Sequence, residues 1–182
     1  MLRCRLLVVL LIVGLAGCTS DKPPVKAFGR VVAIGDSYVS GPGIPAQDPS
    51  SPACVRSDHN YPSLVAKRLR APLTDVSCGG STTETVQSGR PDGQGGSIPS
   101  QLDALGPATK LVMVGVGAND DGLYLGMFVS CLVKTSASDT KCRELAETRA
   151  PAIYAATRDR VAAILSEVKK RAPEARVLLV GY

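Results

Sequence analysis

Four short apolar runs, separated by segments with helical spacing, constrain the fold of this chain more than any other feature. The runs cover residues 31–34, 73–77, 111–116 and 176–180. The third, Leu-Val-Met-Val-Gly-Val, is apolar throughout, as in a strand that helices cover on both faces. Strands that alternate with helices in this way predict a parallel α/β sheet with right-handed crossovers. With 182 residues, 45% of them hydrophobic, we expect one domain with a substantial core.

The segments between these runs carry helix signals. We expect one helix that is capped by Asn60 and has Pro62 in its first turn, a brief helix over residues 100–105, and a long helix from Pro151 to about Arg171. The inward-facing residues would be Leu64, Val65 and Leu69 in the first helix and Ile153, Val161, Ile164 and Val168 in the long one.

Small polar residues directly follow three of the four predicted strands. The first strand ends at Gly35-Asp36-Ser37, the second is followed by Gly79 and Gly80, and the third by Gly117-Ala118-Asn119-Asp120. Ligands of open α/β sheets bind beyond the carboxyl ends of the strands, so we expect these segments to meet at a ligand site. Each segment alone is an ordinary turn composition, and only their recurrence favours a functional site.

The amino-terminal segment has the pattern of an export signal. Two arginines precede an apolar stretch over residues 6–15, which is too short to span a bilayer as a helix of about 20 residues. Small residues before Cys18 are typical of a bacterial lipobox, so we predict a lipoprotein signal peptide over residues 1–17 and lipidation of Cys18. An ordinary secretory signal cut nearby is the alternative. We expect export, with residues 18–28 as a tether to the outer face of the cytoplasmic membrane.

Export also bears on the cysteines, because disulfides form in oxidising compartments. Apart from Cys4 and Cys18, the chain has an even number of cysteines, which predicts disulfides. They are Cys54, Cys78, Cys131 and Cys142. Three connectivities are possible, and we expect the sequential one, which closes short loops. A zinc site is the alternative, but a single histidine and the lack of a Cys-x-x-Cys pair argue against it.

The charge pattern does not favour nucleic-acid binding. The formal net charge is +5, and the cations are scattered except at Lys169-Lys170-Arg171, where they would complement the dipole of the long helix. The chain has two Phe, no Trp and no basic stripe interleaved with aromatic residues. We therefore expect no nucleic-acid partner.

The three strand ends, in this order, resemble the SGNH hydrolase family, also called GDSL-type lipases and esterases, and particularly its exported actinobacterial branch. The similar blocks are Gly35-Asp36-Ser37-Tyr38 with Ser40-Gly41, Arg56-Ser57 before Asn60-Tyr61-Pro62, Asp75-Val76-Ser77-Cys78 before Gly80, and Gln101-Leu102-Asp103-Ala104-Leu105. The resemblance extends from about residue 30 to the end. It implies a flavodoxin-like three-layer sheet in a domain over residues 29–182.

The resemblance also implies serine ester hydrolysis that needs no cofactor and no metal. Ser37 would attack an acyl carbonyl and form an acyl-enzyme. The backbone N–H groups of Ser37 and Gly80 and the side-chain amide of Asn119 would hold the oxyanion. Asp36 and Asp120 are interpreted as supporting residues, with Asp36 as a local cap. The branch shares disulfides in the same regions, which supports the sequential pairing.

The sequence departs from the family pattern in two ways. Ala118 replaces a common glycine, a small change that leaves Asn119 usable. The family supplies its base as a histidine, often in an Asp-x-x-His block beyond the fourth strand, and this sequence stops at Tyr182, before that block. The only histidine, His59, lies in an upstream loop and is expected to be a surface residue. The block would also hold a fifth strand, so we expect residues 177–180 to expose an apolar edge.

These observations predict an exported, lipid-anchored, monomeric serine ester hydrolase that acts on acyl lipids or acylated glycans. As a chain of 182 residues we expect it to have little activity, because Ser37 lacks a base. One alternative is a protein that binds acyl or glycan ligands without hydrolysing them. Another, within the enzyme class, is an envelope carbohydrate O-acetyl esterase. The natural substrate and its acyl length do not follow from the sequence.

Overall fold

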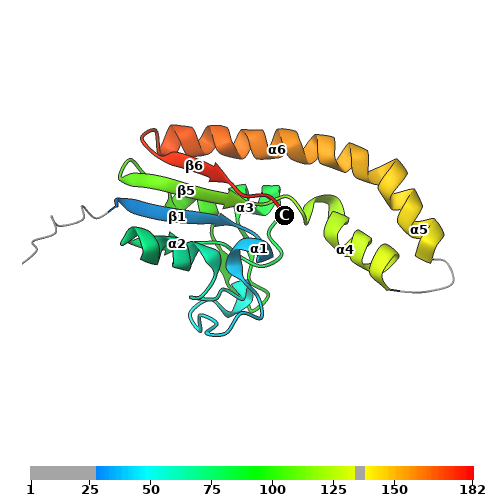
Figure 1. The fold of residues 1–182 in the computed structure, drawn as a ribbon, viewed down its shortest axis with the longest axis horizontal. Helices are drawn as coiled ribbons and strands as arrows, with labels where there is room; N and C mark the ends of the chain where they lie inside the picture. Colours follow the sequence, from blue (N-terminus) through cyan, green and yellow to red (C-terminus); the bar gives the residue numbers. More distant parts are fainter. Residues whose placement is uncertain (1–27, 134–137) are drawn as a thin grey trace, which may run out of the picture.

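A computed structural model describes residues 28–133 and 138–182, which contain a four-stranded parallel sheet (Figure 1). Its strands are β1 (Arg30–Gly35), β2 (Leu73–Asp75), β5 (Thr109–Gly115) and β6 (Arg176–Leu179), and they lie in the order β2-β1-β5-β6. The four predicted strands are thus confirmed. The first strand lies inside the sheet and the chain then winds outward in both directions, which is the flavodoxin-like arrangement.

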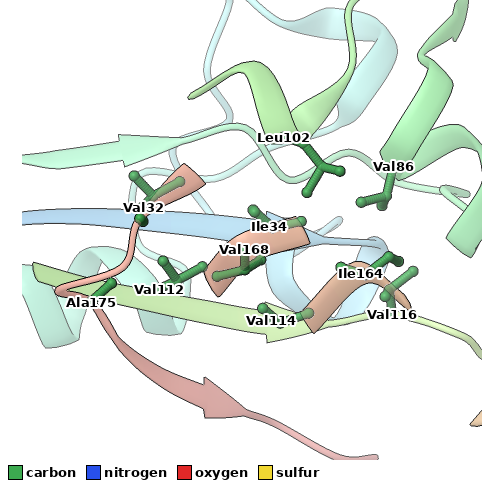
Figure 2. Close-up of a cluster of buried hydrophobic side chains, with 11 residues drawn as sticks. Val32, Ile34, Val86, Leu102, Val112, Val114, Val116, Ile164, Val168 and Ala175 are labelled. Carbon is green, nitrogen blue, oxygen red and sulfur yellow. The ribbon is translucent and has the colours of Figure 1, made fainter. Parts of the chain in front are cut away.

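Helices cover both faces of the sheet, so the three-layer prediction is confirmed (Figure 1). Side chains alternate along β1 and β5 because successive residues of a strand point to opposite faces. One face packs against α3 (Thr83–Ser88), the turn η2 (Gln101–Ala104) and α6 (Ala150–Arg171) (Figure 2). The other packs against α1 (Ser37–Ser40) and α2 (Tyr61–Leu69). The residues on the two faces, none more than 5% exposed, are Val32, Ile34, Val112 and Val114, and Val31, Ala33, Leu111 and Met113.

Helix α2 confirms its predicted start but corrects one predicted core residue. The Asn60 side chain caps it, and Val65 and Leu69 pack against the sheet. Leu64 is 57% exposed, so its predicted inward position is wrong. The buried face is centred on Ala66, and Leu64 lies about 200° from it around the helix.

A helical arm, defined here as residues 123–133 and 138–149, lies beyond the carboxyl end of the sheet (Figure 1). Its elements are α4 (Leu123–Met127), a π-helical turn (Phe128–Leu132), α5 (Ser138–Glu144) and a second π-helical turn (Leu145–Arg149). The second turn continues directly into α6, so Pro151 lies in the second position of that helix. Between Cys131 and Cys142, the segment from residue 138 onward is helical.

The remaining elements are small. They are the turns η1 (Pro52–Cys54) and η3 (Asp120–Gly122) and the hairpin of β3 (Arg90–Pro91) and β4 (Ser97–Ile98). The hairpin lies in the connection between α3 and η2.

The two ends of the described chain differ in burial. Phe28, the last residue of the expected tether, packs against the α2 side of the core. Strand β6 lies at the edge of the sheet, and its Leu178 and Leu179 are 49% and 57% exposed, which confirms the predicted apolar edge.

The predicted signal peptide and Cys18 lie outside the described residues. Among the described helices, none is long and apolar enough to cross a membrane.

Candidate active site

Three loops meet beyond the carboxyl ends of β1, β2 and β5, as the sequence predicts. Gly35 at the end of β1 pairs with Gly115 at the end of β5. The Cys78 N–H after β2 donates to the carbonyl oxygen of Gly35 at 2.9 Å. A Cβ atom at Gly35 would lie 2.3 Å from the Gly115 carbonyl oxygen, so this close approach requires glycine. The segments that contain Ser37, Gly80 and Asn119 are therefore neighbours in space.

Ser37 is the first residue of α1, and Asp36 caps this helix as predicted. The Asp36 carboxylate accepts hydrogen bonds from the Tyr38 N–H at 3.0 Å and from the Tyr182 hydroxyl. Burial raises the pKa of Asp36, and the hydrogen bonds from Tyr182 and Tyr38 oppose this rise. Ser37 itself is half-buried, and within residues 28–133 and 138–182 its hydroxyl has no hydrogen-bond partner.

The other two loops present hydrogen-bond donors beside this turn. Gly80 is exposed, has a φ of +77°, and its backbone N–H donates to no acceptor in the described parts of the chain. The Asn119 side-chain amide donates to the Ser81 carbonyl oxygen at 3.0 Å, which holds it next to Gly80. Ser37, Gly80 and Asn119 thus come from three different strand ends to one region, where their N–H groups could surround a developing negative charge.

A buried amide joins the loops after β1 and β2, a role that the sequence does not predict. Gln101 is 2% exposed; it accepts from the Gly35 N–H at 2.7 Å and donates to the Gly35 carbonyl and the Ser81 hydroxyl, both at 3.0 Å. In the sequence it stands out only as the first residue of the Gln101-Leu102-Asp103-Ala104-Leu105 block. No local pattern could show that it bonds residues 66 and 20 positions away.

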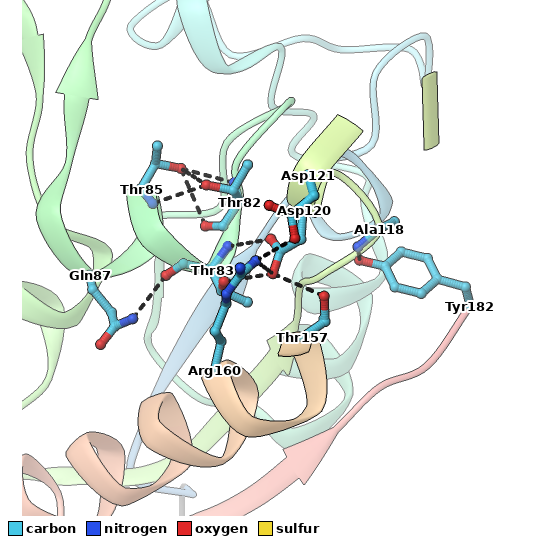
Figure 3. A network of polar contacts seen from close by, with 10 residues as sticks. All are labelled: Thr82, Thr83, Thr85, Gln87, Ala118, Asp120, Asp121, Thr157, Arg160 and Tyr182. Carbon is cyan, nitrogen blue, oxygen red and sulfur yellow. Dashed lines mark hydrogen bonds and ion pairs between the residues drawn. The ribbon is translucent and has the colours of Figure 1, made fainter. Parts of the chain in front are cut away.

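Asp120 makes the structural contacts expected of a supporting residue (Figure 3). Its buried carboxylate accepts from the Thr83 N–H at 2.8 Å, the Thr83 hydroxyl at 2.7 Å and the Thr157 hydroxyl at 3.2 Å. Arg160 bonds mainly to Asp121, at 2.9 Å, and lies 3.5 Å from the Asp120 carboxylate. Asp120 therefore ties the loop after β5 to α3 and α6.

An apolar cleft of about 480 Å³ opens beside the Asn119 loop. Its lining includes Ala118, Tyr124, Met127, Tyr154 and Tyr182, whose hydroxyl bonds to the Asp36 carboxylate. The Tyr182 hydroxyl accepts from the Ala118 N–H at 3.3 Å (Figure 3), and its ring packs on Tyr38 with centroids 5.3 Å apart. The lining of this cleft suits a hydrocarbon chain.

His59, the single histidine of the sequence, is a surface residue as predicted. Its side chain is 64% exposed, and its Nδ1 contacts the neighbouring Asp58 carboxylate. No hydrogen bond in the described residues links it to Ser37. Ser37 thus has no imidazole partner in the described residues.

The sequential disulfide pairing is confirmed. Cys54–Cys78 is buried and adjoins the second site loop, where the Gly79 N–H donates to the Cys54 carbonyl at 2.9 Å. Cys131–Cys142 joins the first π-helical turn of the arm to α5. One bridge therefore lies at the site and the other in the arm.

Comparisons with known proteins agree with this geometry. Residues 33–182 match the GDSL-like lipase/acylhydrolase family. Lipase 2 of Streptomyces coelicolor is 34% identical over 178 residues, which cover 94% of this chain and 59% of that protein. A lipase of Streptomyces rimosus is 31% identical over 171 residues, which cover 92% of this chain and 57% of that protein.

Two solved structures are similar in fold as well. The phospholipase A1 from Streptomyces albidoflavus NA297 has a TM-score of 0.63 and 28% identity, over 85% of this chain and 59% of that one. The extracellular lipase from S. rimosus has a TM-score of 0.63 and 30% identity, over 85% of this chain and 60% of that one. The chain spans about three fifths of the length of these relatives. The family match, the sheet and the three loops together show that the chain belongs to the GDSL-like lipase/acylhydrolase family, the SGNH hydrolases.

Proposed function

We propose that this chain carries the nucleophile and the oxyanion-binding groups of an exported serine ester hydrolase. The observation that carries the proposal is the convergence of Ser37, Gly80 and Asn119 from three strand ends. The chain's relatives include proteins named as lipases and a phospholipase A1, which supports an ester substrate.

The chemistry would proceed through the Ser37 hydroxyl. Its oxygen attacks the acyl carbonyl, its proton passes to a base, and the carbonyl oxygen becomes an oxyanion. The N–H groups of Ser37 and Gly80 and the Asn119 amide stabilise that oxyanion; loss of one such donor typically lowers kcat by about 100- to 1000-fold. The alcohol leaves, and water then hydrolyses the acyl-enzyme. No step requires a cofactor or a metal.

Within residues 28–133 and 138–182, Ser37 has no hydrogen bond to a group that could act as its base. His59 is exposed and contacts Asp58, and the Asp36 carboxylate already accepts from Tyr38 and Tyr182. A positioned general base contributes about 10²- to 10⁴-fold to such reactions. We infer that the polypeptide by itself turns over esters slowly. The missing base also keeps acyl binding without hydrolysis as the second candidate function.

The substrate class is inferred from the cleft. Its lining by Met127, Tyr124 and Tyr154 favours an acyl lipid over an acetylated glycan, since an acetyl group would leave this apolar surface unfilled.

Two disulfides favour an oxidising compartment, and the S. rimosus relative is extracellular. We therefore propose that the protein is exported, with residues 1–17 as the signal peptide and a lipidated Cys18 as the membrane anchor.

Covalent labelling tests the proposal. The purified chain is treated with an alkyl fluorophosphonate at increasing imidazole concentrations, and the adduct is located by mass spectrometry. We expect Ser37 to be labelled slowly, and faster as imidazole supplies the base. Ser37→Ala should abolish the adduct, whereas Ser50→Ala, a change in an exposed loop, should not alter it.

Two outcomes would contradict parts of the proposal. If imidazole-dependent label is absent from Ser37, Ser37 is not a nucleophile, and acyl binding without hydrolysis becomes the better account. If the chain hydrolyses a short-chain aryl ester rapidly without imidazole, and Ser37→Ala removes that activity, a base exists within the polypeptide and the inference of slow turnover is wrong.

A further inference from the structure

The amide of Gln101 directly connects two of the three loops of the candidate site, those after β1 and β2. It is buried at 2% exposure, and it bonds to both the N–H and the carbonyl group of Gly35 and to the Ser81 hydroxyl. Both amide hydrogens and the amide oxygen are therefore used, which is the full donor capacity of a glutamine side chain. A buried, fully bonded amide can hold only one orientation without leaving a polar group unpaired.

The bonds form one continuous path through the site. Gly35 lies two residues before Ser37, and Ser81 directly follows Gly80. The Ser81 carbonyl accepts from the Asn119 amide at 3.0 Å. The path from Gly35 through Gln101 and Ser81 to Asn119 therefore reaches every loop that supplies a proposed oxyanion donor.

The loops need such a connection because their backbone alone does not fix them. Gly80 has a φ of +77°, and no atom of a neighbouring segment lies within 4 Å of the place a Cβ would take; Gly117 has a φ of +130°. Glycine permits many backbone conformations, so contacts from outside the loop must select one. An oxyanion hole works only when its donors are held close to their productive positions, and a displacement of about 1 Å can cost about 100-fold in rate.

We propose that Gln101, acting through Ser81, is a positioning residue that sets the distance of Gly80 and Asn119 from Ser37. The inference rests on the proposed serine hydrolase function and adds a residue to it. Gln101 is buried and its amide bonds to Gly35 and Ser81, so it acts through these residues and not on the substrate. Its part is to hold two loops against the nucleophile turn.

Three variants separate the contributions. Gln101→Leu removes all of the amide's hydrogen bonds and retains an apolar side chain of similar length. Ser81→Ala removes only the bond from Gln101 and leaves the Ser81 carbonyl to bind Asn119. Gln87→Leu is the matched control, since Gln87 is an exposed glutamine on α3 whose amide bonds to the Thr83 carbonyl.

Two readouts are measured on the full chain. The first is the rate constant of Ser37 phosphonylation with imidazole, separated from reagent affinity by its concentration dependence. We expect the bond-forming step to fall about 10- to 100-fold in Gln101→Leu, with affinity little changed, and by less in Ser81→Ala. The second is NMR relaxation exchange at the Gly80 amide and the Asn119 side-chain amide, which we expect to rise in both variants and stay unchanged in Gln87→Leu.

The NMR readout does not depend on Ser37 chemistry, so it separates this inference from the proposed function. Without any Ser37 labelling in the wild type, the proposed function fails while the NMR data still decide whether Gln101 holds the loops. If Gly80 and Asn119 signals are unchanged in the two variants, or labelling falls only in proportion to the folded fraction, Gln101 is an ordinary core residue. If Gln101→Leu does not fold, Ser81→Ala alone decides between these results.

Discussion

Strands β1 and β6 lie on opposite sides of β5 in the same parallel sheet, but their surroundings differ. β1 pairs on both edges, and its residues Val31 to Ile34 are completely buried. β6 pairs only with β5 in the described sheet, and Leu178 and Leu179 are about half exposed. The proposed nucleophile follows the enclosed strand. A turn at the end of such a strand inherits the rigidity of its scaffold, which a reactive serine requires.

The same contrast separates the site loops from the helical arm. The site loops are joined by buried side chains, among them Gln101 and Asp120. The arm exposes apolar residues on α4 and the π-helical turn after it, including Leu125 and Leu132. The proposed catalytic groups thus lie on loops held by buried side chains, and the arm contributes Leu123, Tyr124 and Met127 to the lining of the apolar cleft.

The largest difference in the free energy of unfolding is expected between a truncation in the enclosed strand β1 and one in the edge strand β6. Ile34→Ala removes a completely buried side chain and should lower the free energy of unfolding by about 2 to 5 kcal/mol. Leu179→Ala removes one that is 57% exposed and should change it by about 0.5 kcal/mol or less. Denaturant unfolding of both variants measures the contrast. Equal losses would mean that β6 is covered in solution, and the comparison of the two strands would fail.

The two disulfides offer a sharper version of the comparison. Replacing both cysteines of either bridge by alanine should cost about 3 kcal/mol of unfolding free energy, since the bridges span 24 and 11 positions. Only the loss of Cys54–Cys78 should also shift the Gly80 amide resonance and slow Ser37 labelling, because that bridge adjoins Gly79. A site left intact without Cys54–Cys78, or disturbed by the loss of the arm bridge, would contradict this assignment.

The smallest effect on the free energy of unfolding is expected at Asp36, where hydrogen bonds to the carboxylate oppose the effect of burial on its pKa. Burial raises the pKa of Asp36 in the folded state above its ordinary value of 3.8, so the folded chain binds this proton more tightly than the unfolded chain does. The wild type should therefore lose stability relative to Asp36→Asn as the pH rises from about 4 towards neutrality. The asparagine oxygen can still accept from Tyr38. Unfolding free energies of both proteins are measured across this pH range. We expect the value of the wild type to fall relative to that of Asp36→Asn as the pH rises. A difference that stays constant, or that changes in the opposite direction, would contradict the raised pKa of Asp36.

Much of the fold could be predicted because its signals are local. The apolar runs at β1 and β5 identify buried strands, and their alternation with helices fixes a parallel sheet. Parallel strands bring their carboxyl ends to one edge, so the meeting of Ser37, Gly80 and Asn119 follows from geometry. The sequential cysteine pairing followed from short loops in the same way.

The features that could not be predicted depend on contacts distant in sequence. The inward position assigned to Leu64 failed because several apolar residues of α2 compete for one buried face. The helical arm was missed because α5 is polar and short. It is joined to α6 through one π-helical turn and to the π-helical turn after α4 through a disulfide. Gln101 carries no signal of its own, because its partners lie on other elements.

The structure of the Ser37 phosphonate adduct tests the central claim most directly. The phosphonyl oxygen occupies the place of the oxyanion, and the account predicts that it accepts hydrogen bonds from the backbone N–H groups of Ser37 and Gly80 and from the Asn119 side-chain amide. The alkyl chain should enter the cleft beside Met127 and Tyr154. An adduct whose oxygen points to solvent, or meets other donors while Gly80 and Asn119 remain unengaged, would contradict the assignment of the site.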